Sequence, residues 1–122
     1  MKNRIFIPGD VPSSKNGRVW TGKFFVEKNA VKKYKKFSES AWRDNTDVFL
    51  KMIEGKEPPY SVNFKFIRGT RRKFDYINML QTVQDLMVKN DWIEDDNFTF
   101  LIPVIEVCEY CKESPGIYIN AI

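Results

Sequence analysis

The sequence contains no histidine and only two cysteines, Cys108 and Cys111, among its 122 residues. Both lie in the segment VCEYCKE, where the C-x-x-C spacing can form a redox pair or half of a zinc site. A complete zinc site needs further Cys or His ligands, so we expect none within one chain. If this segment is a strand, the odd spacing also directs the two thiols to opposite faces. We therefore interpret both cysteines as structural or incidental.

The chain also lacks a long apolar run. No stretch approaches the roughly 18 residues of a membrane-spanning helix, so we expect no such helix and no membrane partner. The N-terminal MKNRIFIPGD begins with basic residues but has no apolar stretch long enough for a signal peptide, which predicts a cytoplasmic protein. The content of 43% hydrophobic and 15% aromatic residues is typical of a globular chain. The length fits a single domain spanning residues 1–122.

Charge is unevenly distributed along the chain. The net charge is +4, and the basic excess lies in KNAVKKYKKF and RGTRRK, whereas residues 91–97 are acidic. Such separated patches suit an enzyme that cuts phosphodiesters, because cations bind the backbone while carboxylates hold a metal ion. The same runs are also typical of ordinary solvated faces, so charge alone leaves both interpretations open.

The periodicity of apolar residues predicts two helices. From about Asn29 to Lys51, apolar residues recur mostly at helical spacing, and lysines fill the other face early on. The apolar positions are Val31, Tyr34, Phe37, Ala41, Trp42, Val48 and Phe49. Pro58 and Pro59 terminate this segment, because proline cannot continue a helix. The second helix covers roughly Tyr76 to Lys89, with Asp75 placed as its N-cap.

The remaining segments predict a mixed sheet. KNRIFIPGD gives a short strand that stops at its Pro-Gly pair, and WTGKFFV has the pattern of a hairpin arm. SVNFKFIRG alternates in polarity, which is typical of a half-buried strand. Pro103 in FTFLIPVIEV argues for an edge strand or a bulge, and GIYINAI forms the closing strand. The predicted fold class is α/β (α+β), with one small mixed β-sheet covered by two helices.

The second helix has two predicted faces when successive residues are placed about 100° apart. The apolar arc contains Tyr76, Ile77, Leu80, Val83 and Met87, with Met79 and Leu86 at its edge. The polar arc contains Asn78, Gln81, Thr82, Asp85 and Lys89. Because Ile77 falls on the apolar arc, we expect no metal ligand from that position.

The acids around this helix divide by distance. Asp75 and Asp85 are separated by about 15 Å along a helix, so they cannot hold one ion together. Asp95 and Asp96 form a like-charged pair before a strand, where a bound cation would relieve their repulsion. Asp75 can meet Asp96 only if the chain folds back over the helix start or if a second subunit supplies one of them. The alternative is that these acids only cap a helix and line a solvated turn.

One block of residues, beginning at the second helix, follows the order of a known motif. Its members are Asp75, Asn78, Asp85, Leu86, Trp92, Asp95 and Asp96. Upstream, the segment PSSKN followed by Arg18 resembles the loop that follows the first strand in proteins with this motif. In these features, which run from Ile5 to about Val107, the chain resembles the RusA family of Holliday junction resolvases (crossover junction endodeoxyribonucleases).

The resemblance implies a small homodimeric endonuclease that binds four-way DNA junctions and cuts two strands symmetrically. It implies a requirement for Mg²⁺, with Mn²⁺ as an alternative, and a mixed α/β sheet with two helices. Family members are often carried by phages and prophages. Carried over by position, Asp75 and Asp96 match metal-binding catalytic aspartates, and Asp95 is a further candidate.

Two positions depart from the family motif. Ile77 stands where the family has a second aspartate, and Gln81 stands where it has a lysine thought to assist catalysis. Asp95, Asn78 or Gln81 would have to fill the missing ligand position, which Mg²⁺ tolerates because hard cations accept amide oxygens. The alternative function is therefore a junction-binding module that has lost cleavage. A third is a generic basic protein with no junction preference.

Basic and aromatic residues are candidates for DNA contacts. The residues expected to contact phosphates near the cut are Arg71, Arg72 and Lys73. The residues expected to clamp or open the junction are Lys15, Asn16 and Arg18. The lysines that would attract the arms, or only solubilise the helix, are Lys32, Lys33, Lys35 and Lys36. The aromatics that would wedge between bases, or belong to the core, are Trp20, Phe24 and Phe25.

Overall fold

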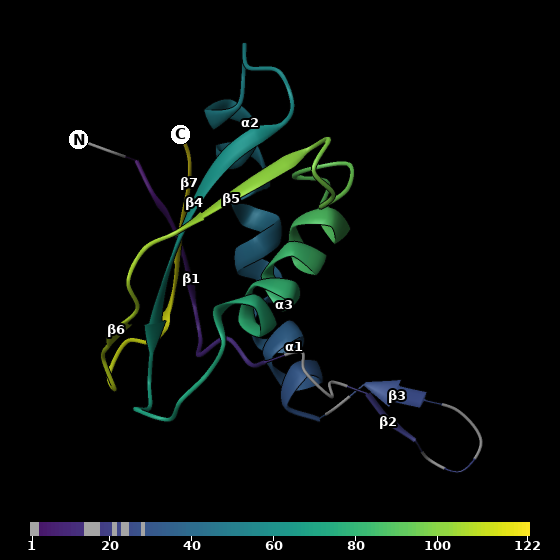
Figure 1. Cartoon of the computed structure of the whole chain (residues 1–122), viewed down its shortest axis with the longest axis vertical. Coiled ribbons are helices and arrows are strands. Elements are labelled where there is room, and N and C mark those ends of the chain that lie inside the picture. The colour runs from purple at the N-terminus through teal and green to yellow at the C-terminus, as the bar shows by residue number, and fades with distance from the viewer. Residues whose placement is uncertain (1–2, 14–17, 21, 23–24, 28) are drawn as a thin grey trace.

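A mixed sheet with helices on one face forms the body of the molecule (Figure 1). The structure is a computed structural model that describes residues 3–13, 18–20, 22, 25–27 and 29–122. The sheet strands are β1 (Ile5–Pro8), β4 (Tyr60–Arg68), β5 (Leu101–Ile105), β6 (Glu109–Tyr110) and β7 (Gly116–Ala121). Their order is β1-β7-β4-β5, and β6 also pairs with β4. A separate hairpin joins β2 (Arg18–Trp20) to β3 (Phe25–Glu27).

The sheet mixes both strand directions. β7 is antiparallel to β1 and β4, whereas β5 is parallel to β4 from Tyr60↔Leu101 to Phe64↔Ile105. The β4–β5 connection passes through a helix, as a parallel pair requires. The mixed α/β class is therefore confirmed. Pro103 lies in β5 at the edge of the sheet, as predicted, because an outer strand tolerates the missing donor.

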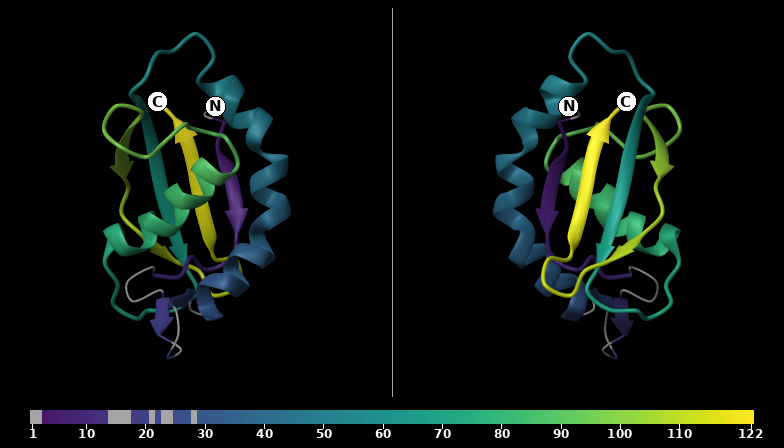
Figure 2. Two further views of the ribbon diagram at one scale, coloured as in Figure 1. Left: turned by 90° about the vertical axis from the view of Figure 1, so that its right-hand side faces the viewer. Right: turned by 90° about the vertical axis from the view of Figure 1, so that its left-hand side faces the viewer.

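Three helices cover one face of the sheet, one more than predicted. They are α1 (Asn29–Asp44), α2 (Thr46–Met52) and α3 (Tyr76–Lys89). Figure 2 shows the opposite face, on which no helix of the described chain lies. No helix of the described residues is long and apolar enough to cross a bilayer.

The single helix predicted from Asn29 to Lys51 is wrong, because it is interrupted at Asn45. The Asn45 side chain donates a hydrogen bond to the Ala41 carbonyl at 2.8 Å, and α2 starts anew at Thr46. Two predicted core positions are also exposed: Phe37 by 66% and Val48 by 44%.

A polar residue takes the place of Phe37 on the buried side of α1. The buried residues of α1 are Val31, Tyr34, Ser38 and Trp42. Ser38 is tolerated there because its hydroxyl donates to the Tyr34 carbonyl at 2.8 Å and accepts from the Trp42 indole at 3.1 Å. A buried hydroxyl with both functions satisfied costs little.

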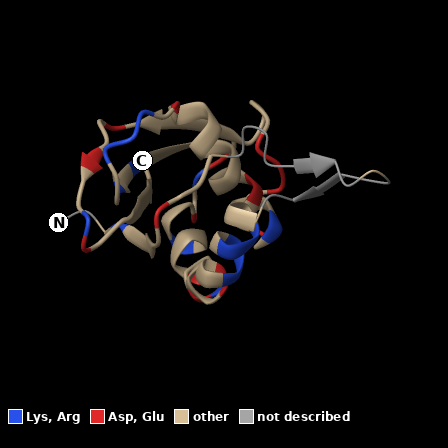
Figure 3. Ribbon diagram, turned by 90° about the horizontal axis from the view of Figure 1, so that it is seen from below, with Lys and Arg blue, Asp and Glu red and all other residues tan. Residues whose placement is uncertain are grey.

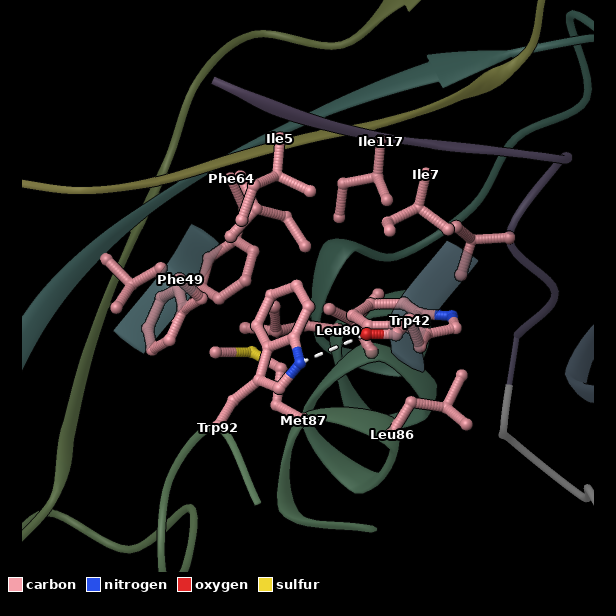
Figure 4. Close-up of a cluster of buried hydrophobic side chains, with 14 of the residues drawn as sticks. Ile5, Ile7, Trp42, Phe49, Phe64, Leu80, Leu86, Met87, Trp92 and Ile117 are labelled. Carbon is pink, nitrogen blue, oxygen red and sulfur yellow. Dashed lines mark hydrogen bonds between the residues drawn. The ribbon is translucent and has the colours of Figure 1, made fainter. Parts of the chain in front are cut away.

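The core centres on Trp92, which lies just after α3 (Figure 4). Its ring stacks on Phe49 at a centroid distance of 4.9 Å and tilts against Trp42 at 5.1 Å. Its indole N–H donates to the Thr46 hydroxyl at 2.9 Å and to the Trp42 carbonyl at 3.3 Å. One side chain thus joins the end of α1, the start of α2 and the segment that follows α3.

Replacing Trp92 with Phe should lower the free energy of unfolding by about 2–4 kcal/mol, because it removes the indole donor and leaves a cavity. Urea unfolding followed by circular dichroism measures this loss. Phe98→Leu is the matched control, since Phe98 is 87% exposed in the same segment and should change stability by less than about 0.5 kcal/mol. Equal losses in the two variants would contradict the central role of Trp92.

Candidate active site along α3

The buried face of α3 differs from the predicted apolar arc. Its buried residues are Met79, Leu80, Thr82, Val83, Leu86 and Met87. Thr82, predicted to be exposed, is 1% exposed, and Ile77, predicted to be buried, is 77% exposed. Thr82 is buried because the segment before the hairpin packs over it, and its hydroxyl donates to the Pro12 carbonyl at 3.2 Å.

This rotation changes the meaning of position 77. Ile77 lies on the solvent side of the first turn of α3, and it lines an open hollow together with Asp75 and Asn78. The prediction that Ile77 is buried, from which we excluded a ligand at this position, is therefore wrong. An acidic side chain there would face the same surroundings as Asp75, whereas the isoleucine leaves an exposed apolar side chain.

Asp75 occupies the N-cap position of α3 but forms no side-chain cap hydrogen bond. Its backbone is extended, with φ −107° and ψ 130°, and its Oδ2 accepts from the Asn78 amide at 3.3 Å. The predicted position is confirmed, while the predicted capping interaction is absent. The carboxylate is exposed and is available to a ligand rather than committed to the helix.

Asp95 and Asp96 belong to the segment between α3 and β5, which starts at the other end of α3 (Figure 1). The helix has 14 residues, which makes it about 21 Å long. Asp75 follows the end of β4, whereas Asp96 precedes β5, whose first residue pairs with the start of β4. One subunit therefore does not bring Asp75 and Asp96 to the same ion, and the alternative of a second subunit remains.

A second group of polar residues forms around the end of α3. The Gln81 amide donates to Asp85 at 3.0 Å, and the charge of Asp85 contributes to the electrostatics of Asp96. Asp85 therefore holds the Gln81 amide and has a small electrostatic effect on Asp96, while Asn78 belongs with Asp75.

Asp96 is the acid with a perturbed ionisation. Burial raises its pKa above the ordinary value, and a hydrogen bond and the negative charge of Asp95 raise it further, with a smaller effect of Asp85. Asp95 is held in place, because it accepts the Asp96 backbone N–H at 2.8 Å and the Asn97 amide at 3.0 Å. A cation would favour ionised Asp96 and offset this repulsion.

The donor chemistry of these residues suits Mg²⁺, although one chain gathers few ligands. Among the described residues, no three or more His, Cys, Asp or Glu side chains group as a metal site. Mg²⁺ needs only one or two carboxylates, because it keeps several waters and takes substrate phosphates as ligands. The pair Asp95–Asp96 and the pair Asp75–Asn78 each supply hard oxygen donors of that kind.

A cationic loop adjoins Asp75. Arg71, Arg72 and Lys73 are exposed, and the last two line a hollow together with Asp75 and Tyr76. Among the described residues, no carboxylate lies within ion-pair distance of these three cations. Within the part of the chain that the structure describes, no carboxylate therefore competes with a phosphate for these three cations.

The other predicted contact residues lie elsewhere or are not described. The lysines of α1 gather on its first half, where Lys32, Lys33 and Lys36 are exposed and Lys35 is half-buried (Figure 3). Arg18 and Trp20 belong to β2, opposite Glu27 and Phe25 of β3. Lys15, Asn16 and Phe24 lie outside the described residues.

An ion pair that the sequence did not reveal anchors the segment leading to the predicted loop. Asp10 Oδ1 lies 2.8 Å from Arg68 Nε, and Asp10 Oδ2 accepts the Gly69 N–H at 3.0 Å. The Arg68 guanidinium also lies over the Phe74 ring at 4.6 Å. These contacts attach Asp10 to the end of β4 and, through Arg68, to Phe74, which precedes α3. No local sequence signal predicts them, because the partners are far apart in the chain.

Both cysteines are free thiols on either side of β6. The Cys108 backbone N–H donates to the Tyr76 hydroxyl at 2.9 Å, and the Cys111 N–H donates to the Arg68 carbonyl at 2.9 Å. Burial raises the pKa of the Cys108 thiol, which makes it a poor nucleophile at neutral pH.

The sequence was compared with protein-family models and with curated proteins. The chain matches no protein-family model. A search of curated proteins gives no match either. The likeness to junction resolvases therefore depends on the residues described above and on their arrangement.

Asp96→Asn should stabilise the fold at neutral pH. Because the folded state raises the pKa of Asp96, the folded state binds this proton more tightly than the unfolded chain does. The free energy of unfolding therefore falls as the pH rises from the pKa of this carboxyl in the unfolded chain, which is near 4, through its higher pKa in the folded state. Without metal, urea unfolding should show the variant more stable than the wild type at pH 7, with the difference shrinking toward pH 3.

Glu94→Gln is the matched control for this measurement, because it removes one exposed charge from the same segment. An equal gain for Asp96→Asn at both pH values would show that ionisation of this carboxyl is not the cause.

Proposed function

We propose that this protein is a metal-dependent endonuclease of the RusA type that resolves four-way DNA junctions as a homodimer. The observation that carries the proposal is the exposed carboxylate of Asp75, which forms no N-cap hydrogen bond and directly follows the cationic loop Arg71–Lys73. A scissile phosphate needs cations that hold it and an acid that holds a metal next to it. The order of the family motif along α3 adds independent support.

A two-fold dimer follows from the separation of the acids. In an isologous dimer the same surface of both subunits meets, and a two-fold axis perpendicular to α3 would make two copies of this helix run antiparallel. The Asp75 end of one helix would then lie beside the Asp96 end of the other. Ile77 supports such packing, because a large apolar side chain that is 77% exposed would be covered by the second subunit.

The roles of the residues follow from this arrangement. Asp75, assisted by Asn78, and Asp96, assisted by Asp95, would hold Mg²⁺ or Mn²⁺ between subunits. The bound metal would supply an activated water and stabilise the charge that develops on the phosphate. The cationic loop Arg71–Lys73 would hold the strand being cut, and the predicted loop residues Lys15, Asn16 and Arg18 would contact the junction.

Mixing two inactive variants tests the shared site. Asp75→Asn and Asp96→Asn should each abolish junction cutting in Mg²⁺ or Mn²⁺ while leaving junction binding intact. Refolded together, they form heterodimers with one intact and one doubly altered site. Random mixing should restore nicking to about a quarter of the wild-type rate, because half of the dimers carry one of two sites.

The outcomes separate the alternatives clearly. Glu94→Gln, the control in the same acidic segment, should cut at the wild-type rate. If each variant loses all activity and mixing restores none, the site is not shared between subunits, but the proposed endonuclease activity stands. Equal cutting by wild type and Asp96→Asn would overturn the assignment of Asp96.

A second candidate is a junction-binding module that has lost cleavage. Its support is the isoleucine at position 77 and the glutamine at position 81, whose amide is held by Asp85 at 3.0 Å and carries no charge. In this case, the basic surfaces would bind DNA while the acids would only shape the fold.

Binding and cutting of a synthetic four-way junction distinguish the two candidates. The endonuclease should nick the junction in Mg²⁺ and bind it more tightly than a linear duplex of the same length. Tight junction binding without nicking would favour the module. Equal affinity for both substrates, lost steeply with salt, would indicate only a generic basic protein.

A further inference from the structure

Arg71 is stacked on an aromatic ring that the sequence did not single out. Its guanidinium lies 4.0 Å from the centroid of the Tyr110 ring. Tyr110 is 42% exposed, and Arg71 is exposed as well. A cation over a ring face at this distance is attracted by the ring quadrupole. Its N–H groups point outward in the plane of the guanidinium, so stacking leaves them available for hydrogen bonds.

Tyr110 is well supported as a platform. It belongs to β6, which pairs with β4 at Ile67↔Glu109 and Arg68↔Tyr110. Backbone hydrogen bonds fix both flanks of β6, from Cys108 to the Tyr76 hydroxyl and from Cys111 to the Arg68 carbonyl. Arg71, in contrast, lies in the connection between β4 and α3. The ring therefore holds a loop cation against a rigid part of the sheet.

The neighbouring arginine has a different task. Arg68 also lies over a ring, that of Phe74, at 4.6 Å. Its side chain is only 14% exposed, and it forms an ion pair with Asp10 at 2.8 Å. Arg68 is therefore committed to the fold, whereas Arg71 keeps its donor groups for a ligand. Within the described residues, Arg71 has a ring contact but no ion pair.

We infer that Tyr110 is a positioning residue that orients Arg71 to bind a backbone phosphate of the nucleic acid. This inference rests on the proposed function and extends its contact surface from the loop before α3 to β6. Held in one orientation, the Arg71 guanidinium donates two parallel hydrogen bonds to two oxygens of one phosphate. The neighbouring Arg72 and Lys73 attract the same strand without a ring to orient them. The phosphate held by Arg71 lies on the strand that passes Asp75.

A double-mutant cycle on the full chain tests the inference. The variants are Arg71→Ala, Tyr110→Leu, Tyr110→Phe and the combination of Arg71→Ala with Tyr110→Leu. Binding of a labelled four-way junction and of a matched duplex is measured over a series of salt concentrations in Ca²⁺, without cleavage. Tyr118→Leu is the control, since Tyr118 also lies beneath an arginine, Arg4, at 5.8 Å, but belongs to β7, which pairs with β4 on the other side from β6.

Each variant has a defined expectation. Arg71→Ala should weaken binding about three- to tenfold and lower the salt slope by about one ion. Tyr110→Leu should weaken binding about two- to fivefold, the range for an exposed cation–π contact. Tyr110→Phe should bind like the wild type, because the ring is retained. The double variant should be no weaker than Arg71→Ala alone, because the tyrosine acts through the arginine.

The possible failures are distinguishable. If Arg71→Ala weakens binding but Tyr110→Leu does not, or if the two losses add fully, the positioning role is overturned while the proposed function stands. If Tyr118→Leu weakens binding as much as Tyr110→Leu, the effect is not local and the inference fails. If the wild type binds neither DNA, the proposed function fails and the inference fails with it.

Discussion

The buried indole of Trp92 is the contact on which the arrangement of this protein depends. It stacks on Phe49, touches Trp42 and donates its N–H to the start of α2. Because Trp92 follows α3 directly, this packing fixes where the chain turns after the helix and therefore where Asp95 and Asp96 are presented. Trp92 is thus a structural anchor for the acidic pair that follows it.

The second constraint is the rotation of α3 about its own axis. Thr82 is buried against the segment that contains Pro12, and Asp10 holds that segment through Arg68. These contacts hold the segment of Asp10 to Pro12 between the end of β4 and the middle of α3, and the burial of Thr82 leaves Ile77 facing outward. This rotation exposes Ile77, which the sequence predicted to be buried, whereas Gln81 is exposed as predicted.

The separation of the acids gives the molecule two unequal ends. The Asp75 end combines a carboxylate that makes no cap hydrogen bond with three cations, one of which, Arg71, lies over an aromatic ring. The other end holds a like-charged pair in which burial and repulsion raise the pKa of Asp96. Neither end alone resembles a complete catalytic centre, but the two are chemically complementary, since one attracts phosphate and the other attracts a cation. A two-fold partner is the simplest geometry that unites them.

The sequence by itself determined the mixed sheet and the start of α3, and it limited the segment of Pro103 to an edge strand or a bulge, because these depend on alternation, on proline and on local helix signals. It also identified the exposed acids and the cationic loop, whose charges are visible without a structure. Only the tertiary structure decided which face of α3 is buried, since a threonine can be buried when a distant carbonyl accepts its hydroxyl. Likewise, the break at Asn45, the Asp10–Arg68 pair and the stacking of Arg71 on Tyr110 join residues whose meeting depends on the path of the whole chain. Spacing along a helix predicts distances within it, but only the packing of other segments against that helix sets which way its side chains face.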